Sequence, residues 1–185
     1  MHTVLTHPLV KHRVTLMRDI NTKPKQFREL VNEITEFLAI ESLKDLRTVE
    51  IPVTTPVAKT TGVKIEDSIV IVPILRAGMG MLDAMLHVLP YAKVPPAKND
   101  ELAIVIDPML ATGGSACDAF AQLKKLGYRR IVFLNLIAAP EGIAKVEKEH
   151  PDVPVFTAAK DERLNSHFYI VPGLGDAGDR IFGTL

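Results

Sequence analysis

Four short apolar runs in the second half of the chain constrain the fold more than any other feature. They are SIVIVPIL from residue 68, LAIVID from residue 102, RIVFLNLIAA from residue 130 and VPVFTAA from residue 153. Continuous runs rich in valine and isoleucine suit strands that are buried on both faces of a parallel sheet. Helical patterns separate the runs, over Met79–Leu89, Ser115–Leu126 and Pro140–Glu149. The alternation predicts an α/β domain with right-handed crossovers.

The N-terminal third has a different character. A short helix with Pro8 in its first turn precedes an amphipathic helix within NTKPKQFRELVNEITEFLAIESL, for which Thr22 is the expected N-cap. RTVEIPVTTPVAKTTGVKI alternates apolar and polar residues and contains prolines, which predicts one or two edge strands. The C-terminal stretch has too many turn-forming residues for regular structure. We therefore expect a single domain over residues 1–185, with an α/β core over 68–160 and a distinct segment over 161–185.

Composition argues against several classes of protein. The chain has 22 basic and 22 acidic residues, which disfavours a broad basic surface for nucleic acid or for an anionic membrane. The single cysteine, Cys117, rules out an internal disulfide and fits a reducing compartment. The first residues lack the apolar core of a signal peptide, and no apolar run approaches the roughly 20 residues that span a bilayer. We expect a cytoplasmic protein.

The stretch LAIVIDPMLATGGSACDAFAQLKKLG combines the features of a phosphate-binding loop. Asp107 follows an apolar strand, and the bend through Thr112, Gly113, Gly114 and Ser115 leads into a helix. Unpaired backbone N–H groups and the positive end of a helix dipole both favour an anion, and glycine allows its close approach. Neither the Walker pattern nor G-x-G-x-x-G occurs at this loop. The alternative is an ordinary strand–turn–helix corner capped by Ser115, but the aspartate and the threonine favour a site for a phosphorylated sugar.

Two further segments lie near expected strand ends, and ligands of α/β proteins bind beyond the carboxyl ends of strands. Arg76 follows the first apolar run, between apolar segments where an unpaired charge would be costly, so an anionic ligand is its expected partner. YIVPGLGDAGD contains Gly173, Gly175 and Gly178, which favours recognition of a flat heterocycle by backbone groups. Taken alone, these features also fit a solvated arginine and a tight surface loop. The histidines show no metal-ligand spacing, and no nucleophile has a nearby base.

The motif VIDPMLATGGSA is similar to the phosphoribosyl-diphosphate-binding motif of type I phosphoribosyltransferases. Together with PILRAG before it and YIVPGLGDAGDRIFGT after it, this motif resembles the uracil phosphoribosyltransferase family, which HPLVKHRVTLMRD, AAPEG and DERLN also fit. The resemblance covers nearly the whole chain. It implies a mostly parallel sheet flanked by helices, with N-terminal helices and a C-terminal base-binding segment. It also implies transfer of the phosphoribosyl group from phosphoribosyl diphosphate to uracil, which gives UMP and pyrophosphate.

The resemblance implies roles by position. The residues implied to bind phosphoribosyl diphosphate are Arg76, Asp107, Pro108, Met109, Leu110, Ala111, Thr112, Gly113, Gly114, Ser115 and Asp176. Those implied to bind uracil, largely through backbone groups, are Ile170, Gly175, Asp176 and Ala177. The implied catalytic residues are Arg76 at the diphosphate, Asp107 at the ribose hydroxyls and Asp176 through metal-bound water. Mg²⁺ is the implied cofactor, held mainly by substrate and water, with no direct protein ligand.

The resemblance also bears on partners. It implies a dimer or tetramer of this chain, with uracil, phosphoribosyl diphosphate and UMP as ligands and GTP as an effector to be considered. Two alternatives stay open: a phosphoribosyltransferase for another base, and a non-catalytic regulator that binds nucleotides or RNA on the same fold. The balanced charge disfavours RNA.

One segment departs from the family. Where the family carries an arm of about twenty additional residues, far longer than a usual α/β loop, this chain has only YAKVPPAKNDE over Tyr91–Glu101. The arm of the family carries a second arginine for phosphoribosyl diphosphate, whereas the cations here are Lys93 and Lys98. YAKV is typical of the strand that leads into the arm, and PPAKNDELAIVID of the segment that follows it. We hypothesise that the sequence joins two ends across a missing arm, between Val94 and Pro95.

Overall fold

The computed structural model describes residues 1–90 and 100–184, so the junction between Val94 and Pro95 lies outside the described residues. The helices are α1 (Pro8–Arg18), α2 (Pro24–Ser42), the 3-10 helix η1 (Ala77–Met81), α3 (Leu82–Val88), α4 (Gly114–Lys125), α5 (Pro140–Glu149) and α6 (Ala177–Phe182). The strands are β1 (His2–Val4), β2 (Thr48–Thr54), β3 (Lys59–Ile65), β4 (Ile69–Pro73), β5 (Leu102–Ile106), β6 (Met109–Leu110), β7 (Arg130–Ala138), β8 (Val155–Lys160), β9 (Arg163–Leu164) and β10 (Ile170–Val171).

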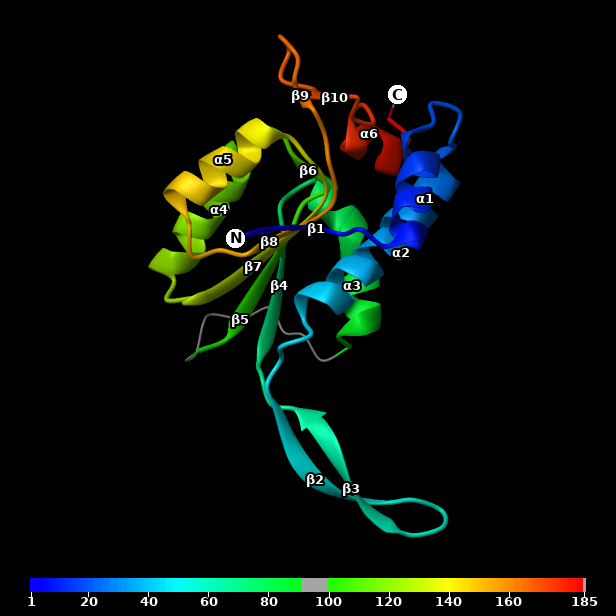
Figure 1. The fold of residues 1–185 in the computed structure, drawn as a ribbon, viewed down its shortest axis with the longest axis vertical. Helices are drawn as coiled ribbons and strands as arrows, with labels where there is room; N and C mark the ends of the chain where they lie inside the picture. Colours follow the sequence, from blue (N-terminus) through cyan, green and yellow to red (C-terminus); the bar gives the residue numbers. More distant parts are fainter. Residues whose placement is uncertain (91–99, 185) are drawn as a thin grey trace.

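A parallel sheet forms the centre of the molecule, in the order β1-β8-β7-β5-β4, with β6 paired to the end of β7 (Figure 1). The register places Ile71 beside Ile104, and Ile104 beside Val132. The four apolar runs of the sequence correspond to β4, β5, β7 and β8, which confirms the predicted α/β fold. Because the strands are parallel, their carboxyl ends meet at one edge of the sheet.

Helices cover both faces of the sheet (Figure 1). On one face, α1, α2, α3 and α6 share a core with Ile104 and Leu134. On the other face, α4 and α5 pack on Val105 and Phe133, and the Phe120 ring of α4 meets the Phe133 ring edge-on at 5.4 Å between centroids. Successive residues of one strand therefore enter opposite cores, which explains why the strand runs are continuously apolar.

The two N-terminal helices form as predicted, with one difference at a cap. α1 begins at Pro8. α2 begins at Pro24 and its N-cap is Lys23, so the prediction that Thr22 caps it is wrong. Proline at the first helical position sets the start of α2 two residues after Thr22. The Thr22 hydroxyl instead donates to the Leu16 carbonyl at 2.6 Å, in the turn between the two helices.

Several elements differ from the sequence-based expectation. β1 pairs in parallel with β8, so the sheet extends beyond residues 68–160. The helix expected over Met79–Leu89 is divided into η1 and α3. The segment over 161–185, expected to lack regular structure, contains the short elements β9, β10 and α6. Each of these elements is short, and short elements depend on tertiary pairing more than on local sequence pattern.

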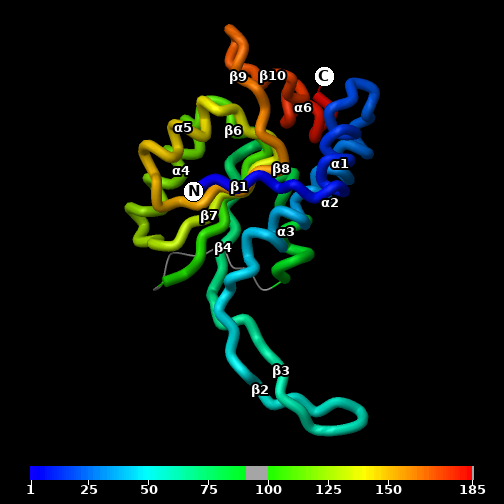
Figure 2. Tube along the Cα trace, in the orientation of Figure 1, coloured from blue at the N-terminus to red at the C-terminus, as the bar shows by residue number. Residues whose placement is uncertain are grey.

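β2 and β3 form an antiparallel hairpin that is separate from the main sheet and projects away from it (Figure 2). The predicted strands therefore exist, but they pair with each other and do not form an edge of the main sheet. Val63 on this hairpin is 71% exposed, and Val49 and Ile65 are also exposed. A two-stranded hairpin is only marginally stable alone in water, so these exposed apolar side chains favour a partner that covers them.

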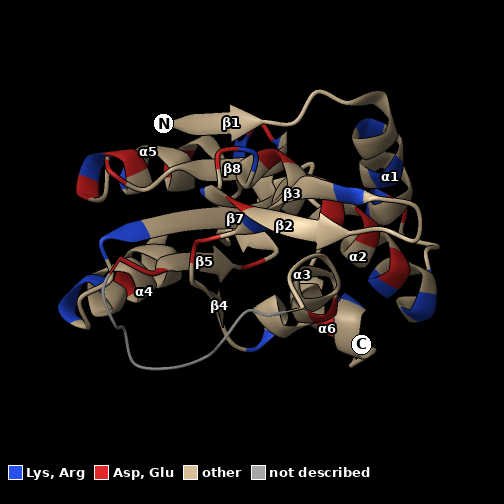
Figure 3. Ribbon diagram, turned by 90° about the horizontal axis from the view of Figure 1, so that it is seen from below, with Lys and Arg blue, Asp and Glu red and all other residues tan. Residues whose placement is uncertain are grey.

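Charged residues of both signs are mixed over the described elements. Figure 3 shows acidic and basic residues interspersed along α2, α4 and α5, in line with the formal net charge of zero. None of the helices that the structure describes has the length and apolarity needed to cross a membrane.

A charged cluster joins the base of the hairpin to the amino-terminal edge of the sheet. The buried carboxylate of Asp67, which precedes β4, accepts hydrogen bonds from Arg130 Nη1 at 2.5 Å and from the Nε and backbone N–H of Arg47 at 2.7 Å each. The hydrogen bond from Arg130 is the largest cause of a pKa of Asp67 well below its ordinary value. The ionised carboxylate thus stabilises this edge of the fold.

Asp67→Asn removes this charge and keeps the shape of the side chain. We expect the free energy of unfolding to fall by about 1.5–3 kcal/mol near pH 7, the usual worth of hydrogen bonds to charged groups. Because the folded-state pKa is lowered, the contribution of Asp67 is present above the ordinary aspartate pKa and is lost as the pH falls from about 4 towards the lowered pKa. The difference between parent and variant should therefore narrow in acid.

Urea unfolding of both proteins at neutral and acid pH measures this difference. Asp45→Asn, at an exposed turn position, is the control and should leave stability nearly unchanged. A deficit for Asp67→Asn that is equally large at both pH values would contradict the role of the charge.

Candidate active site

Three segments that the sequence singled out follow β4, β5 and β8, at the carboxyl edge of the sheet. Direct contacts join the first two. The Ile74 N–H donates to the Ile106 carbonyl oxygen at 3.0 Å, and a Cβ on Gly78 would lie 2.5 Å from the same oxygen. The turn that carries Arg76 therefore packs on the end of β5, next to Asp107.

The loop that begins at Asp107 ends in the first turn of α4. Gly113 has a φ of +79° and is the N-cap of α4, which begins at Gly114. Ser115 lies inside the helix, so the alternative in which it caps an ordinary corner is wrong. The Cys117 N–H donates to the Gly113 carbonyl, which leaves the N–H groups of residues 114–116 ahead of the first intrahelical hydrogen bond. This end of the helix dipole is positive and suits an anion.

The two glycines of this loop differ in their surroundings. A Cβ on Gly113 would lie 3.0 Å from the Gly142 carbonyl oxygen, and the positive φ adds strain, so the fold requires this glycine. A Cβ on Gly114 would meet nothing closer than Thr112 Oγ1, at 3.7 Å. Packing does not explain a glycine at position 114. A ligand that approaches the backbone would explain it.

Lys145 of α5 adds a cation that the sequence did not indicate. Its ammonium lies 4.0 Å from the position that a Cβ on Gly114 would take. α5 comes this close because Gly142 has no side chain: a Cβ there would lie 2.4 Å from the Ala111 carbonyl oxygen. Lys145 follows an ordinary amphipathic pattern, and only the packing of α5 on the loop reveals it. The Gly114 N–H donates to Thr112 Oγ1 at 3.4 Å, a long hydrogen bond. An ammonium beside the N–H groups at the start of a helix suits a phosphate.

Asp107 is half-buried at the start of the loop. Burial raises the pKa of its carboxyl to about 7, and the hydrogen bond from the Met109 N–H opposes this shift only in part. Near neutral pH the group can therefore accept hydrogen bonds as a carboxylate or donate one as an acid. Either form can bind the hydroxyl groups of a sugar.

Arg76 is exposed, which corrects one step of the sequence argument. We expected apolar surroundings to make an unpaired charge costly there, and this expectation is wrong because the side chain reaches solvent. The guanidinium carbon lies 5.8 Å from the centre of the Phe182 ring, a cation–π contact that the sequence did not indicate. The Arg76 side chain thus lies against the C-terminal segment.

The C-terminal segment packs against the turn that carries Arg76. A Cβ on Gly178 would lie 4.0 Å from the Cβ of Ala77, and one on Gly80 would meet Ile181 Cδ1 at 2.7 Å. The turn that carries Arg76 therefore adjoins both the end of β5 and the C-terminal segment at the carboxyl edge.

The predicted uracil-binding residues fall into two groups. Ile170 and Ala177 are buried and belong to the hydrophobic core, whereas Gly175 and Asp176 are exposed. Gly175 has a φ of +82°, a conformation in which glycine is favoured. Asp176 is the N-cap of α6, and its Oδ1 accepts a hydrogen bond from the Asp179 N–H at 2.9 Å. The core thus fixes the ends of a short backbone segment whose middle reaches solvent.

Among the described residues, one group of side chains has the spacing of a metal site, and it lies between α4 and α5. Ligand atoms of Cys117, Glu149 and His150 lie within 4.8 Å of one another. However, the Lys124 ammonium is 3.1 Å from His150 Nδ1, and burial together with Glu149 raises the pKa of the Cys117 thiol to about 11. A protonated thiol near an ammonium is a poor ligand set, and we assign no metal to it.

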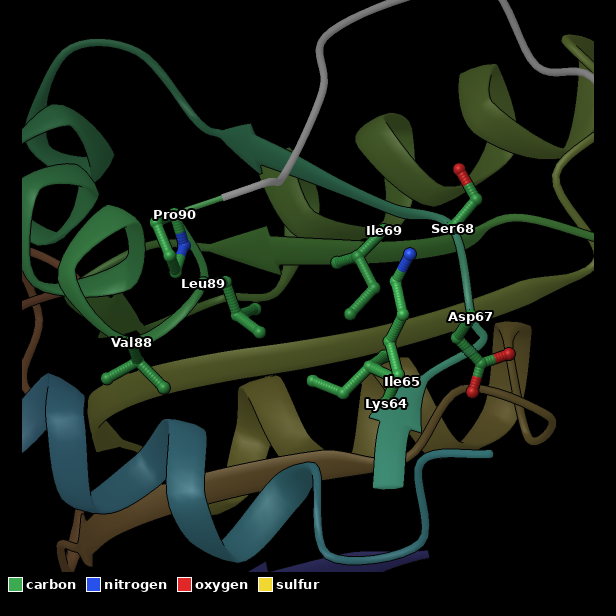
Figure 4. A pocket seen from close by; sticks show the side chains of 8 residues that line it. All are labelled: Lys64, Ile65, Asp67, Ser68, Ile69, Val88, Leu89 and Pro90. Atoms are coloured by element: carbon green, nitrogen blue, oxygen red, sulfur yellow. The ribbon is translucent and has the colours of Figure 1, made fainter. Parts of the chain in front are cut away.

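A pocket of about 740 Å³ lies at the amino-terminal edge, between the end of β3, the start of β4 and the end of α3 (Figure 4). It is lined by Lys64, Ile65, Asp67, Ser68, Ile69, Val88, Leu89 and Pro90. Asp67 already binds two arginines, and the sequence continues from Pro90 into residues that the structure does not describe. None of the predicted site residues lines this pocket.

Comparisons with known proteins relate the whole chain to one family. The family model described as uracil phosphoribosyltransferase matches residues 4–97 and 88–184. A uracil phosphoribosyltransferase from Exiguobacterium sibiricum is 48% identical over 203 aligned positions, covering 98% of this chain and 97% of that protein. A protein of the same name from a Roseiflexus species is 50% identical over 199 positions, covering 96% of each.

Solved structures agree with the fold. A protein from Aquifex aeolicus matches with a TM-score of 0.93 and 35% identity over 98% of both chains. Adenine phosphoribosyltransferase from Trypanosoma brucei, in complex with AMP, pyrophosphate and ribose-5-phosphate, matches with a TM-score of 0.59 and 13% identity, over 95% of this chain and 88% of that one. The second likeness shows the fold alone, which is that of the type I phosphoribosyltransferases.

The comparisons also bear on the expected arm. The alignment with the Exiguobacterium protein has 203 positions and this chain has 185 residues, so at least 18 positions, the difference of the two, have no counterpart here. The family model matches in two parts, which overlap at residues 88–97. The match is therefore interrupted where the arm of the family was expected.

Gly114→Val distinguishes a role of the loop over 107–115 in phosphate binding from a role in stability. Because position 114 accepts a side chain, we expect the melting temperature to stay close to that of the parent. The added methyl groups should block the approach of a phosphate to the N–H groups of residues 114–116, so calorimetric titration with UMP should lose its binding signal. Gly113→Val, in contrast, should lower the melting temperature. Unchanged UMP affinity in folded Gly114→Val would place the phosphate elsewhere.

Proposed function

Since the chain belongs to the uracil phosphoribosyltransferase family, we propose that it transfers the 5-phosphoribosyl group from phosphoribosyl diphosphate to uracil, with UMP and pyrophosphate as products. The observation that supports this most is the meeting of three motifs at one edge of the sheet: the turn of Arg76, the loop over 107–115 and the segment over 170–177. Phosphoribosyl diphosphate carries a diphosphate on C1′, the reacting carbon, and a phosphate on C5′. Uracil must approach C1′. Three adjoining subsites suit this requirement.

In this proposal the loop over 107–115 holds the phosphoribosyl portion. The N–H groups of residues 114–116 and the Lys145 ammonium bind the 5-phosphate, because both are donors at the positive end of α4. The Asp107 carboxyl binds the ribose hydroxyls. Its raised pKa should fall when it accepts hydrogen bonds from them, because hydrogen bonds to the charged form favour that form.

The bond from C1′ to the diphosphate oxygen breaks, and its electron pair leaves with pyrophosphate. The sugar becomes oxocarbenium-like, and uracil N1 forms the new bond to C1′ as the N1 proton passes to solvent water. Arg76 stabilises the negative charge that develops on pyrophosphate, and the backbone of Ile170, Gly175 and Ala177 holds uracil with N1 in line. This chemistry requires no protein nucleophile.

Mg²⁺ belongs to this proposal as an ion held by the diphosphate and by water. The two carboxyl groups of the site fit an ion that is held without direct protein ligands. Asp176 Oδ1 is engaged by the Asp179 N–H, and Asp107 is half-buried with a raised pKa. Neither is set up as a direct ligand, and Asp176 can still accept a hydrogen bond from metal-bound water. The ion, when bound, would neutralise part of the charge on the diphosphate.

The functional form in this proposal is a homo-oligomer in the cytoplasm. Support comes from the projecting β2–β3 hairpin, whose exposed apolar side chains a second copy of the chain would cover. A GTP effector stays an expectation from the family resemblance alone.

Measured turnover of uracil distinguishes the proposed enzyme from the two alternatives, an enzyme for another base and a non-catalytic regulator. An enzyme for another base would accept that base in place of uracil, and a regulator would bind UMP without forming it. The names of the relatives support uracil and an enzyme.

Steady-state formation of UMP from uracil and phosphoribosyl diphosphate, with Mg²⁺ present, tests the proposal. We expect cytosine to be rejected by as much as about 10⁴–10⁵ in kcat/KM, because its reversed donor and acceptor would leave backbone groups at the site unpaired. Comparable turnover of cytosine or of a purine would assign the enzyme to another base. UMP binding without UMP formation would assign a regulator.

Arg76→Ala tests the role at the diphosphate. We expect kcat/KM to fall by roughly 10²–10³, the usual effect of removing one donor to a developing charge. Folding should be retained because Arg76 is exposed. Arg129→Ala, at an exposed position before β7 on the opposite edge, is the matched control. Near-normal turnover of Arg76→Ala would remove Arg76 from the mechanism.

A further inference from the structure

A buried polar link connects the end of α1 to the segment over 170–177. Arg18, the last residue of α1, forms a two-pronged ion pair with Asp161, and its Nη1 lies 2.8 Å from Asp161 Oδ2. The same Nη1 donates to the Gly173 carbonyl at 2.7 Å, and Asp161 Oδ2 accepts from the Gly173 N–H at 2.8 Å. Both backbone polar groups of Gly173 are therefore held by one ion pair. The Asp161 side chain is only 3% exposed.

Gly173 is a sensitive point of this segment. It has a φ of +61°, and a Cβ there would lie 2.1 Å from the Ile170 carbonyl oxygen. The turn is thus closed tightly on Ile170, and Gly175 follows two residues later. A displacement of Gly173 must move both residues, which are proposed to contact uracil.

A second arginine, Arg180, also connects the C-terminal segment to the end of α1, but its side chain starts from α6. Arg180 of α6 donates to the carbonyl groups of Met17 at 2.8 Å, Asp19 at 2.6 Å and Leu174 at 3.0 Å. Its guanidinium also lies over the Phe27 ring of α2, 4.4 Å from the centroid. Arg180 therefore holds α6 against the end of α1. The pair of Arg18 and Asp161 is the one that, among the described residues, binds the polar groups of Gly173 itself.

Stability alone does not account for this buried pair. Taking two charges out of water offsets most of their attraction, and apolar residues of the same volume often stabilise a fold as well. A bidentate arginine fork differs from apolar packing because it fixes the orientation of the groups that it binds. Backbone groups that bind a flat base need a fixed orientation, since the donors and acceptors of a base lie in one plane.

We propose that Arg18 and Asp161 are positioning residues for the base, so that uracil recognition depends on α1, which does not itself belong to any predicted subsite. The inference rests on the proposed function. Arg18 and Asp161 lie in the stretches HPLVKHRVTLMRD and DERLN, but the sequence implied no role for either residue. Neither needs to touch the substrate. The pair acts through Gly173 on the backbone at Ile170 and Gly175.

The test is a set of variants measured with the full chain. Arg18→Met removes the ion pair, and we expect it to raise the KM for uracil by roughly 10- to 100-fold. The KM for phosphoribosyl diphosphate should stay within about twofold, because the phosphate loop lies on a different segment. Arg18→Lys, which retains the charge but not the fork, should give a smaller rise in the KM for uracil. Arg13→Met, on the same helix and paired with Glu33, is the control and should leave both KM values unchanged.

A double-mutant cycle completes the test. The double variant with Asp161→Asn and Arg18→Met should raise the KM for uracil much less than two independent effects would. The reason is that both residues act through Gly173. If Arg18→Met does not fold, Arg18→Lys must still change the KM for uracil selectively. An unchanged KM for uracil, or an equal loss for both substrates, would overturn the positioning role. A parent protein that forms no UMP would instead overturn the proposed function, whatever the variants do.

Discussion

The parallel pairing of β4, β5, β7 and β8 is the constraint on which the rest of the structure depends. Strands buried by helices on both faces must make all their connections at two opposite edges. At the carboxyl edge, Arg76, Asp107 and Asp161 each follow a strand closely and therefore lie at the same edge of the sheet. At the amino-terminal edge, Asp67 and its two arginines join the hairpin to the sheet. The fold thus separates a charged cluster that stabilises it from the groups that suit a ligand.

Recognition by backbone groups makes the site depend on residues that do not touch a ligand. A side chain can reach its target through rotation about several bonds, but a backbone N–H is only as well placed as its segment. The loop over 107–115, proposed to bind phosphate, is held by α5 through the close approach at Gly142. The segment over 170–177, proposed to bind the base, is held by α1 and α6 through Arg18 and Arg180. The helices on each side of the sheet therefore have a role at its edge as well as in its cores.

The sequence predicted the central sheet well because continuous apolar runs report burial on both faces directly. It predicted the loop over 107–115 because a strand end, two glycines and a helix start are adjacent in the chain, so the pattern is local. The expected strand ends placed the motifs PILRAG and YIVPGLGDAGD at the edge where ligands bind, and the family resemblance assigned them to one site. Parallel strand order, which brings them together, is a tertiary property that no single motif contains.

The misjudged charged residues have one physical cause: local sequence pattern does not determine exposure or long-range polar contacts. Arg76 stands between apolar segments, yet its side chain reaches solvent at the edge. Arg18 reads as an ordinary cation at the end of a helix, where it would favour the helix dipole, and Asp161 as an ordinary loop acid. The fold places them in contact across most of the chain and buries the carboxylate. A buried carboxylate needs a partner, and an arginine with donors to spare can bind a neighbouring carbonyl at the same time. In this protein that carbonyl belongs to Gly173, so one ion pair both satisfies a buried charge and orients the segment proposed to read the base.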